Sequence, residues 1–485
     1  MPEFDLLVIG GGPGGYVAAI RAAQRGLNVG LVEKERPGGV CLNWGCIPTK
    51  AMLRSAEVFH TIAHAADFGI YADNLRFDYA AVRQRKDGIV KELTDGVAGL
   101  LKANGVTVIE GHARFTGPTT VEVVEAGPSP IFEGGPRYAA APTANAVRTV
   151  SAKDVIIATG SVPAVLPIPG ADLPGVITSD GAFGLTEVPK RLVVIGGSAV
   201  GAEWANLFHE FGADVTVVEM QDRLVPLEDK EIGTALVRSF TKRGIKVLTG
   251  ATVTAIAEAA NGLTVTVGGA KPQELPADVV LVGVGRRPNT AQLGLDVAGI
   301  ETDARGFIPV DEHLRTGVEH VYAIGDVTGK ALLAHVASHQ GLVASDTIAG
   351  HEAHIDYNVI PAATFTHPEI ASVGLTEDAA KAAGHDVIVA KFPFAALGRA
   401  KSFGDQEGFL KIVAGAKHKE VLGVHIIGPS ASDLIIEGAL AISLEATLDE
   451  LAETIHAHPT LGEIGMEAAL VGLGLPVHVA PPRKR

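Results

Sequence analysis

Apolar residues near the start of the chain alternate between short continuous runs and helical spacing. Runs at Phe4–Ile9 and Val29–Glu33 flank an amphipathic stretch from about Gly14 to Arg25. Short apolar runs bounded by glycine predict buried strands, and apolar residues at every third or fourth position predict a helix. This segment is therefore predicted to form a βαβ unit.

The same plan returns further along the chain. Arg191–Ile195 and Val215–Glu219 are predicted strands on either side of a helix from about Val200 to Phe211. Parallel strands that alternate with helices indicate an α/β fold, here with two dinucleotide-binding sheets. Three more predicted strands complete the sheets and run into glycine-containing loops: Asp154–Ala158 before Gly160, Val279–Val284 before Gly285, and His320–Ile324 before Gly325.

From about Gly350 the pattern changes to spaced strands and amphipathic helices, which predicts a separate C-terminal α+β domain. Its expected elements are strands Val387–Phe392, Phe409–Val413 and Val421–Ile427 and a helix around Leu434–Leu444. Gly127–Val150 is rich in proline, alanine and glycine and has little periodicity, so we expect an extended surface loop within the first domain.

Composition and charge narrow the class of protein. The 485 residues are 47% hydrophobic and 20% charged, so roughly two to four domains with apolar cores are expected. A net charge of −15 disfavours nucleic acid as a partner. The sequence has neither a membrane-spanning apolar run nor a signal-peptide pattern, which predicts a cytoplasmic protein.

The first glycine loop places Gly10, Gly12 and Gly15 directly after a strand, and Glu33 ends the next strand. Glycine is needed where a Cβ would meet a pyrophosphate or the facing strand, and the helix N-terminus offers amide donors to phosphate. Glu33 is expected to accept hydrogen bonds from ribose hydroxyls. A simple turn is the alternative, but strand, helix and acidic residue together favour nucleotide binding.

The second glycine loop contains Gly196, Ser198 and Gly201, so serine replaces the middle glycine. Its Cβ is expected to crowd the phosphate, although its hydroxyl could donate a hydrogen bond. Glu219 stands at the ribose position, and only Arg223 is near it in sequence, which favours NAD over NADP. A dinucleotide-type domain without ligand stays open as the alternative.

The only two cysteines, Cys41 and Cys46, stand in the segment GGVCLNWGCIPTK. Within one regular helix they would lie on different faces, so we expect the helix to begin or bend near Gly45, which Pro48 favours. Cys46 would then lie at an amide-rich helix end with Lys50 on the same face, and both features stabilise a thiolate. Two buried, inert cysteines are the alternative, and a metal site lacks further ligands.

A histidine motif, HAHPTLGE, lies near the C-terminus and contains His456, His458 and Glu463. A carboxylate after a proline turn can hydrogen-bond one ring nitrogen of a histidine and leave the other free as a base. The alternative, a metal pair at His456 and His458, lacks convergent ligands, and His335 with His339 lacks the glutamate of a metalloprotease motif.

These motifs, with GVGRRPN (Gly283–Asn289) and YAIGDV (Tyr322–Val327), closely resemble dihydrolipoyl dehydrogenases, which belong to the pyridine nucleotide-disulfide oxidoreductases. The resemblance covers nearly the whole chain. It implies an α/β fold of two Rossmann-like dinucleotide-binding domains plus a C-terminal α+β dimerisation domain. The expected divisions are an FAD-binding domain over residues 1–161, an NAD-binding domain over 162–280, a central segment completing the FAD domain over 281–349, and a dimerisation domain over 350–485.

The resemblance also implies residue roles in the oxidation of dihydrolipoamide by NAD through FAD. Cys46 is expected to face the flavin and Cys41 to exchange with the substrate, while Lys50 and Glu203 form an ion pair beside the flavin. His458, supplied across the dimer interface, is expected to be the base, oriented by Glu463. The expected cofactor-binding set is Gly10, Gly12, Gly15, Glu33, Lys50, Gly160, Gly325, Asp326 (near the ribityl and pyrophosphate region), Ala334 and His335 (near the isoalloxazine), with Gly196, Ser198, Gly201, Glu219 and Gly285.

The partners implied by the resemblance are a second copy in a homodimer and the lipoyl domain and dihydrolipoyl acyltransferase core of a 2-oxo acid dehydrogenase complex, or the lipoyl protein of glycine cleavage. Related reductases of glutathione, mercuric ion, another disulfide or a quinone are alternatives, as is a non-catalytic flavoprotein docking subunit. Acidic Glu219 disfavours a glutathione reductase, and the lack of a C-terminal cysteine pair disfavours a mercuric reductase.

Overall fold

The computed structural model describes residues 2–126, 142–269 and 271–481. The chain divides into two compact units, which are described separately below. The first unit comprises Met1–Val165, Ile177–Val188 and Gly285–Ile355, and the second comprises Leu166–Val176, Pro189–Val284 and Asp356–Arg485.

The first unit is built on one seven-stranded sheet. The strands of this unit are β1 (Phe4–Ile9), β2 (Val29–Glu33), β3 (Thr107–Glu110), β4 (His112–Gly117), β5 (Thr120–Ala126), β6 (Pro142–Ile157), β7 (Ser161–Pro163), β16 (Arg286–Pro288) and β17 (Val321–Ala323). Its helices are α1 (Pro13–Gln24), α2 (Gly39–Trp44), α3 (Cys46–Ala63), η1 (Ala65–Phe68), α4 (Tyr79–Ala103), α5 (Ser179–Ala182), η2 (Gly325–Thr328) and α8 (Ala334–Ile348).

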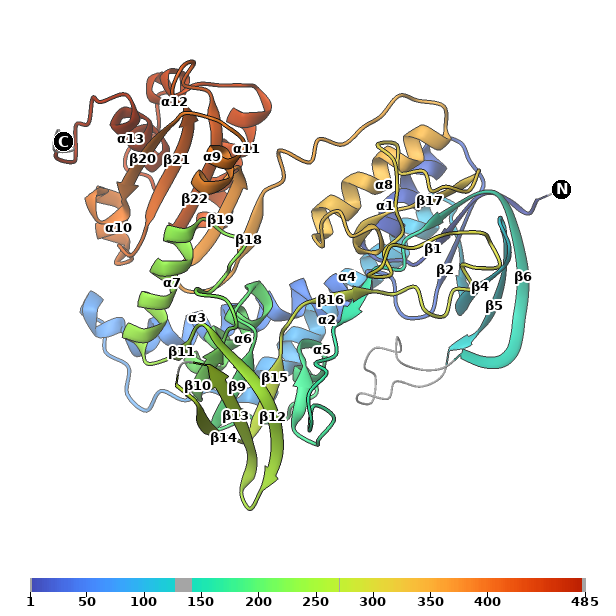
Figure 1. Cartoon of the computed structure of the whole chain (residues 1–485), viewed down its shortest axis with the longest axis horizontal. Helices are drawn as coiled ribbons and strands as arrows, with labels where there is room; N and C mark the ends of the chain where they lie inside the picture. Colours follow the sequence, from blue (N-terminus) through green and yellow to red (C-terminus); the bar gives the residue numbers. More distant parts are fainter. Residues whose placement is uncertain (1, 127–141, 270, 482–485) are drawn as a thin grey trace. The chain divides into compact units, whose positions relative to one another are not determined.

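The sheet order is β3-β2-β1-β6-β5-β4, with β17 also paired to β6 (Figure 1). Strands β3, β2, β1 and β17 run parallel with the end of β6, whereas β4, β5 and the start of β6 are antiparallel. A short antiparallel ribbon, β7 with β16, lies outside this sheet. The carboxyl ends of the parallel strands carry the glycine loops, where ligands of such sheets bind.

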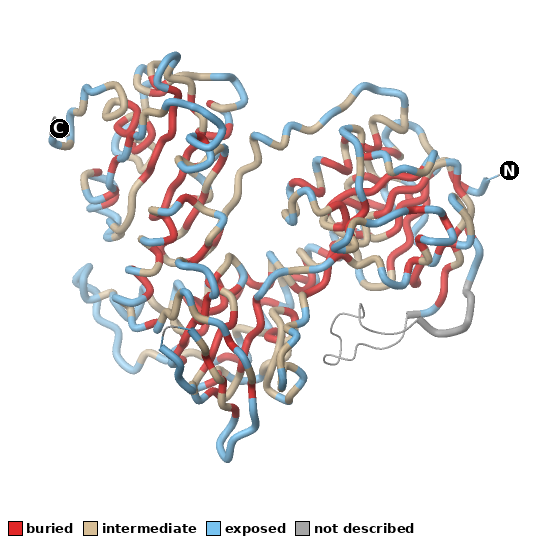
Figure 2. Tube along the Cα trace, viewed as in Figure 1, coloured by how far each residue is buried: buried red, intermediate tan, exposed pale blue. Residues whose placement is uncertain are grey.

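Alternation along β1 shows how this sheet is buried on both faces. Leu6 and Val8 pack with α1, α4 and α8, and Leu7 and Ile9 pack with the β4–β5 meander. Successive strand residues point to opposite faces, so a strand covered on both sides is apolar throughout. The central strands are accordingly among the buried parts of the chain in Figure 2.

The second unit contains a second sheet in the order β11-β10-β9-β15-β8, in which β11, β10, β9 and β15 are parallel and β8 spans the boundary between the units. It also contains a three-stranded antiparallel sheet β12-β13-β14 and a five-stranded antiparallel sheet β18-β19-β22-β21-β20. The strands are β8 (Val176–Thr178), β9 (Arg191–Ile195), β10 (Asp214–Val218), β11 (Lys246–Leu248), β12 (Ala251–Ala259), β13 (Gly262–Gly269), β14 (Gln273–Ala277), β15 (Val279–Val282), β18 (Ala362–Thr364), β19 (Glu369–Gly374), β20 (Val387–Pro393), β21 (Phe409–Gly415) and β22 (Val421–Gly428). The helices are α6 (Ala199–Glu210), α7 (Lys230–Arg243), α9 (Glu377–Ala382), η3 (Phe394–Ala396), α10 (Gly398–Phe403), α11 (Ala431–Ser443), α12 (Leu448–Glu453) and α13 (Glu463–Gly472).

A buried charge cluster joins α7 and α9 to the five-stranded sheet within this unit. Lys411 is only 1% exposed. Its ammonium donates to Asp229 at 3.0 Å, Glu231 at 3.0 Å and Glu377 at 2.7 Å. Burial alone would raise the pKa of Asp229, but the Glu231 amide and Lys411 together lower it. The ammonium is therefore held by several carboxylates, as a buried charge requires.

Most predicted elements are confirmed. The strands Phe4–Ile9, Val29–Glu33 and Arg191–Ile195 have the predicted bounds. The prediction of a loop over Gly127–Val150 is wrong for residues 142–150, which form the start of β6 and pair with β5. A neighbouring strand in space supplies the hydrogen bonds there, and the local composition does not reveal that partner. Residues 127–141 lie outside the described part of the chain.

Candidate active site

The two cysteines lie on either side of a helix junction in the first unit. Cys41 is on α2 and half-buried, whereas Cys46 is exposed as the first residue of α3; no disulfide joins them in this structure. Gly45 separates the helices, and a Cβ there would lie 2.9 Å from the Val40 carbonyl oxygen. The predicted helix start near Gly45 is thus confirmed, and the break lets residues five positions apart approach each other.

The electrostatics of the pair are asymmetric. Hydrogen bonding to Cys46, burial and the charge of Cys46 raise the pKa of the Cys41 thiol, while the Lys50 ammonium acts in the opposite direction. The raised pKa of Cys41 favours the protonated form of this thiol. The first-turn amides of α3 have no side-chain cap, so the positive end of the helix dipole favours a thiolate at Cys46.

The cysteine segment packs directly on the first glycine loop. The Gly38 amide donates to the Gly11 carbonyl at 2.8 Å, and a Cβ on Gly39 would lie 2.6 Å from the Gly12 Cα. A Cβ on Gly15 would come within 1.8 Å of the Gly10 carbonyl oxygen, so only glycine permits the tight turn into α1. The fold thus brings the cysteine pair and the first dinucleotide motif together.

Glu33 closes the first motif from the end of β2. Its two oxygens accept the amides of Gly11 at 2.5 Å and Glu35 at 2.8 Å. Burial raises the pKa of this carboxyl, and both amide hydrogen bonds oppose the rise. The amides orient the carboxylate, whose remaining lone pairs can accept from ribose hydroxyls.

The second motif repeats this geometry in the second unit. Glu219 accepts the amides of Gly197 at 2.6 Å and Gln221 at 2.7 Å, and a Cβ on Gly201 would lie 1.9 Å from the Gly196 carbonyl oxygen. The two motifs therefore share one construction, although they belong to different sheets.

Ser198 fits this construction without backbone strain. Its φ and ψ are −76° and −174°, close to the −68° and −177° of Gly12. Any residue adopts this extended conformation, so glycine is not required for the turn itself. The Ser198 side chain does not cap α6, which leaves its hydroxyl and the first-turn amides available to a phosphate.

The residues of the first unit fit a bound dinucleotide. No side chain caps the first turn of α1, and the Thr159 hydroxyl is buried with no hydrogen-bond partner among the described residues. Both features leave polar groups that a polar ligand can satisfy. Gly14 lies against Ala337, which places α8, with Ala334 and His335 at its start, beside the same loop.

Asp326 follows Gly325 at the start of η2, and its Oδ2 accepts from the Ser161 hydroxyl at 2.5 Å. Ser161 follows Gly160 and accepts from Arg286, which follows Gly285. The sequence-based reasoning selected the glycines and Asp326 but missed Ser161 and Arg286. Only the position of Arg286 inside the motif GVGRRPN gave a signal.

The histidine motif forms two hydrogen-bonded pairs in the second unit. His458 Nδ1 lies 2.9 Å from Glu463 Oε1, and the other Glu463 oxygen accepts the Thr460 amide at 2.8 Å. Burial acts to raise the pKa of Glu463, but the Thr460 amide and His458 outweigh it and lower that pKa. His456 Nε2 lies 2.7 Å from Glu437 Oε1, a contact that sequence-based reasoning missed because the residues are far apart in the chain.

Glu203 is buried on α6, and its Oε1 accepts the Phe365 amide at 2.9 Å. Glu203 and Lys50 belong to different units, so their expected ion pair stays a prediction. In the described residues, no group of three or more histidine, cysteine, aspartate and glutamate side chains could hold a metal ion. No described helix is long and apolar enough to cross a membrane.

Comparison with known proteins bears directly on this geometry. Residues 4–341 match the family model described as pyridine nucleotide-disulphide oxidoreductase, and residues 360–469 match the dimerisation domain of the same family. The chain belongs to this family. The predicted fold class, the flavoprotein oxidoreductase class, and FAD and NAD as cofactors are thereby confirmed.

Individual relatives of this oxidoreductase carry a more specific name. A dihydrolipoyl dehydrogenase of Chlamydia muridarum is 44% identical, with 99% of each chain covered, and one of Geobacillus stearothermophilus is 45% identical, with 98% of each covered. Among solved structures, LpdA from Mycobacterium tuberculosis has a TM-score of 0.85 at 28% identity, covering 96% of this chain and 98% of its own. The prediction of a dihydrolipoyl dehydrogenase is confirmed by these relatives.

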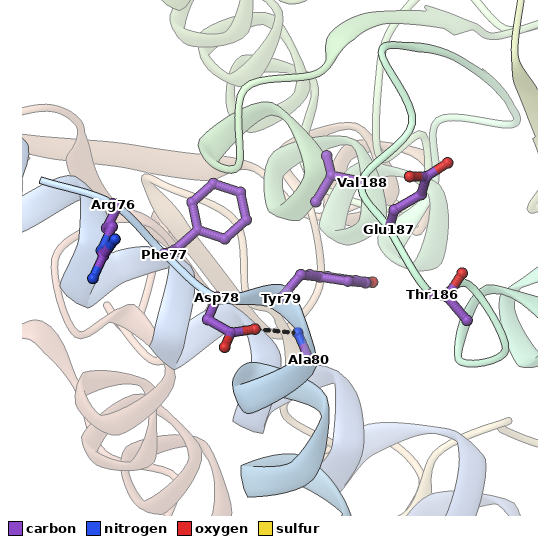
Figure 3. Close-up of a pocket in the computed structure, with 8 residues that line it drawn as sticks. All are labelled: Arg76, Phe77, Asp78, Tyr79, Ala80, Thr186, Glu187 and Val188. Carbon is purple, nitrogen blue, oxygen red and sulfur yellow. Dashed lines mark hydrogen bonds between the residues drawn. The ribbon is translucent and has the colours of Figure 1, made fainter.

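A cavity of about 760 Å³ in the first unit of this oxidoreductase does not belong to the candidate site. In Figure 3, Phe77, just before α4, and Tyr79, its first residue, lie on one side of the cavity, and Thr186, Glu187 and Val188 lie on the other. Burial raises the pKa of Tyr79 to about 12. None of the sequence-predicted site residues lines this cavity.

Proposed function

We propose that this oxidoreductase transfers electrons from protein-bound dihydrolipoamide to NAD through the Cys41–Cys46 pair and bound FAD. The observation that carries the proposal is the cysteine junction at Gly45, packed on the dinucleotide loop through Gly12 and Gly39. Bound FAD supplies two-electron transfer between the cysteine pair and NAD. The substrate loses two electrons and two protons, NAD takes both electrons with one proton, and one proton is released.

His458 begins the proposed reaction by taking a proton from one substrate thiol. The thiolate attacks Cys41 of the oxidised pair, and Cys46 leaves as a thiolate. The second substrate thiol then attacks the mixed disulfide, so lipoamide departs and Cys41 regains a proton. The raised pKa of Cys41 supports this final state, and the amide end of α3 supports charge on Cys46.

Glu463 fixes the ring of His458 for this role. The hydrogen bond to Nδ1 leaves Nε2 as the proton acceptor, and the side chain of His458 is 76% exposed. A base on an exposed loop of the dimerisation domain fits the proposal that it serves a second copy of the chain. The residues proposed to hold FAD are those of the first loop with Glu33, Gly160, Gly325 and Asp326, and those for NAD are the second loop with Glu219 and Gly285.

We propose a homodimer that receives its substrate from the lipoyl domain of a 2-oxo acid dehydrogenase complex or of glycine cleavage. Ile436 and Leu440 on α11 and Leu444, the residue directly after it, stand at four-residue spacing and are 66%, 60% and 69% exposed. An apolar stripe on the domain that matches a dimerisation model supports a second copy as its cover. A reversible dithiol also suits a reducing compartment such as the cytoplasm.

Initial rates of NAD reduction test the proposed substrate and cofactor. Dihydrolipoamide with NAD is expected to be turned over. Reduced glutathione in place of dihydrolipoamide is expected to give a rate lower by at least about tenfold. NADP in place of NAD is expected to lower the rate by a similar factor, because Glu219 opposes a 2′-phosphate. Equal rates with glutathione would contradict the proposed substrate class. Equal rates with NADP would contradict the role of Glu219.

A further inference from the structure

A chain of hydrogen bonds leads from Arg286 through Ser161 to Asp326 in the first unit. Arg286 Nε donates to the Ser161 hydroxyl at 2.7 Å, and its Nη2 donates to the Ser161 carbonyl at 2.8 Å. The Ser161 hydroxyl in turn donates to Asp326 Oδ2 at 2.5 Å. Ser161 itself is 3% exposed.

The direction of these hydrogen bonds follows from the donors present. A guanidinium has donors only, so the Ser161 oxygen must accept from Arg286. The single hydroxyl hydrogen of Ser161 is then directed to Asp326, which makes Oδ2 an acceptor. None of the other described residues donates a hydrogen bond to Oδ1, so that oxygen is available to a ligand.

Local backbone structure places the three groups. Strands β7 and β16 pair antiparallel, with Arg286 opposite Pro163 and Pro288 opposite Ser161. The Asn289 amide donates to the Gly160 carbonyl at 3.0 Å and extends this pairing. The ribbon thus holds the serine and the arginine in register beside η2, which carries the aspartate.

We propose that Ser161 and Arg286 are positioning residues that orient the Asp326 carboxyl as an acceptor for hydroxyl groups of bound FAD. The inference rests on the proposed function, which takes Asp326 as a contact of FAD. It adds two residues that do not touch the reacting atoms and act through the carboxylate.

The charge balance at Asp326 supports this role. Burial raises the pKa of Asp326, whereas the hydrogen bond from Ser161 and the charge of Arg286 act to lower it. No other charged group of the described residues contributes substantially to this balance. Loss of the serine hydroxyl would remove a hydrogen bond that favours the charged form of this buried carboxyl. A protonated carboxyl is a poorer acceptor.

A double-mutant cycle on FAD affinity tests the proposal. Apoprotein of each variant is titrated with FAD, and the dissociation constant is read from quenching of flavin fluorescence. Ser161→Ala is expected to raise the dissociation constant at least about tenfold, because a hydrogen bond to a charged group is lost. Ser161→Thr keeps the hydroxyl and is expected to stay near the wild-type value.

The matched control is Ser345→Ala, which removes a buried hydroxyl of the same unit that bonds the Ala18 carbonyl at 2.8 Å. It is expected to leave FAD affinity unchanged. In an Asp326→Asn background, Ser161→Ala is expected to have no further effect, because the serine acts through the carboxylate. Multiplicative effects of the two substitutions, or wild-type affinity of Ser161→Ala, would overturn the proposal.

If Ser161→Ala apoprotein does not fold, as judged by circular dichroism, Arg286→Gln takes its place in the same cycle with the same expected outcomes. Failure of the proposed function looks different, because wild-type protein would then bind no FAD or would not oxidise dihydrolipoamide. If only this inference fails, wild-type protein still binds FAD and oxidises dihydrolipoamide, and only the double-mutant cycle departs from the expected result.

Discussion

At the scale of single residues, Gly45 and Cys41 explain why the cysteine pair is chemically unequal. The break at Gly45 ends α2 and starts α3, so Cys46 receives the amide end of a helix while Cys41 stays half-buried. The substrate attacks the oxidised pair, in which each sulfur is bonded to the other and neither can take up the substrate proton. A separate base is therefore needed, and His458 with Glu463 is the proposed one.

We predict that His458→Gln lowers kcat for dihydrolipoamide oxidation about 100- to 10,000-fold, because general-base catalysis is lost. FAD content should not change, since His458 lies in the dimerisation domain. The measurement is steady-state NAD reduction together with the flavin absorbance of the purified protein. His478→Gln is the matched control. His478 Nδ1 lies 2.6 Å from Glu467 Oε1, and Glu467 lies on α13, as Glu463 does. Equal losses in both variants would contradict the role of His458.

Substitutions at Ser198 and Gly201 are expected to change NADH affinity to very different extents. Ser198→Gly should leave the dissociation constant of NADH within about threefold, because the serine already has the backbone of a glycine loop. Gly201→Ala should raise it about 10- to 100-fold, because its Cβ would collide with the Gly196 carbonyl. Fluorescence titration with NADH measures both, and a large loss in Ser198→Gly would show that serine supplies a required hydrogen bond.

Sequence patterns identified those residues whose chemistry depends on neighbours in the chain. Cys41, Cys46 and Lys50 share one segment, and His458 and Glu463 share one turn, so spacing indicated the first group and the family resemblance assigned the second. Ser161 and Glu437 act through residues distant in sequence. Such contacts depend on which strands and helices pack together, which spacing does not determine.

At the scale of elements, apolar runs predicted β1, β2 and β9 well because each strand is buried on both faces of a parallel sheet. The start of β6 was missed because it belongs to an antiparallel meander whose pairing partner is β5. The charge cluster at Lys411 was also missed, because its carboxylates come from the start of α7 and from α9.

We predict that Lys411→Met destabilises the second unit by about 3–5 kcal/mol, because it leaves the buried Asp229 carboxylate without its ammonium. Lys419→Met removes an exposed pair with Asp449 and should cost less than about 1 kcal/mol. Thermal unfolding at neutral pH compares the two variants. Similar small shifts in Tm for both would show that the cluster contributes little.

Acid provides an internal check on the same cluster. The pKa values of Asp229, Glu231 and Glu377 are lowered, so their stabilising contribution is present above their ordinary values and is lost as pH falls through the lowered ones. The difference in Tm between wild type and Lys411→Met should therefore shrink at acidic pH. A difference that is constant down to acid unfolding would contradict the electrostatic account.

At the scale of the whole molecule, the proposed activity requires a second copy of the chain. Leu440→Glu places a charge in the exposed stripe of α11 and is expected to convert a dimer to a monomer. Leu227→Glu changes a similarly exposed leucine, 88% exposed, outside α11 and should leave the dimer intact. Sedimentation velocity separates the two results, and a dimeric Leu440→Glu protein would place the interface elsewhere.

Family and fold class could be predicted from the sequence because the motifs are local and lie in order along the chain. The division into four parts at residues 161, 280 and 349 remains a prediction. Residues 1–165, 177–188 and 285–355 form one compact unit, and residues 166–176, 189–284 and 356–485 form the other. Partners outside the chain leave no local pattern of this kind and stay proposals.

The most direct measurement of the central claim compares Cys41→Ser and Cys46→Ser with wild type in NAD reduction by dihydrolipoamide. Each variant is expected to keep bound FAD, because neither sulfur belongs to the glycine loops, and to lose turnover by at least about a thousandfold, because the disulfide cannot form. Turnover near the wild-type rate in either variant would contradict electron transfer through this pair.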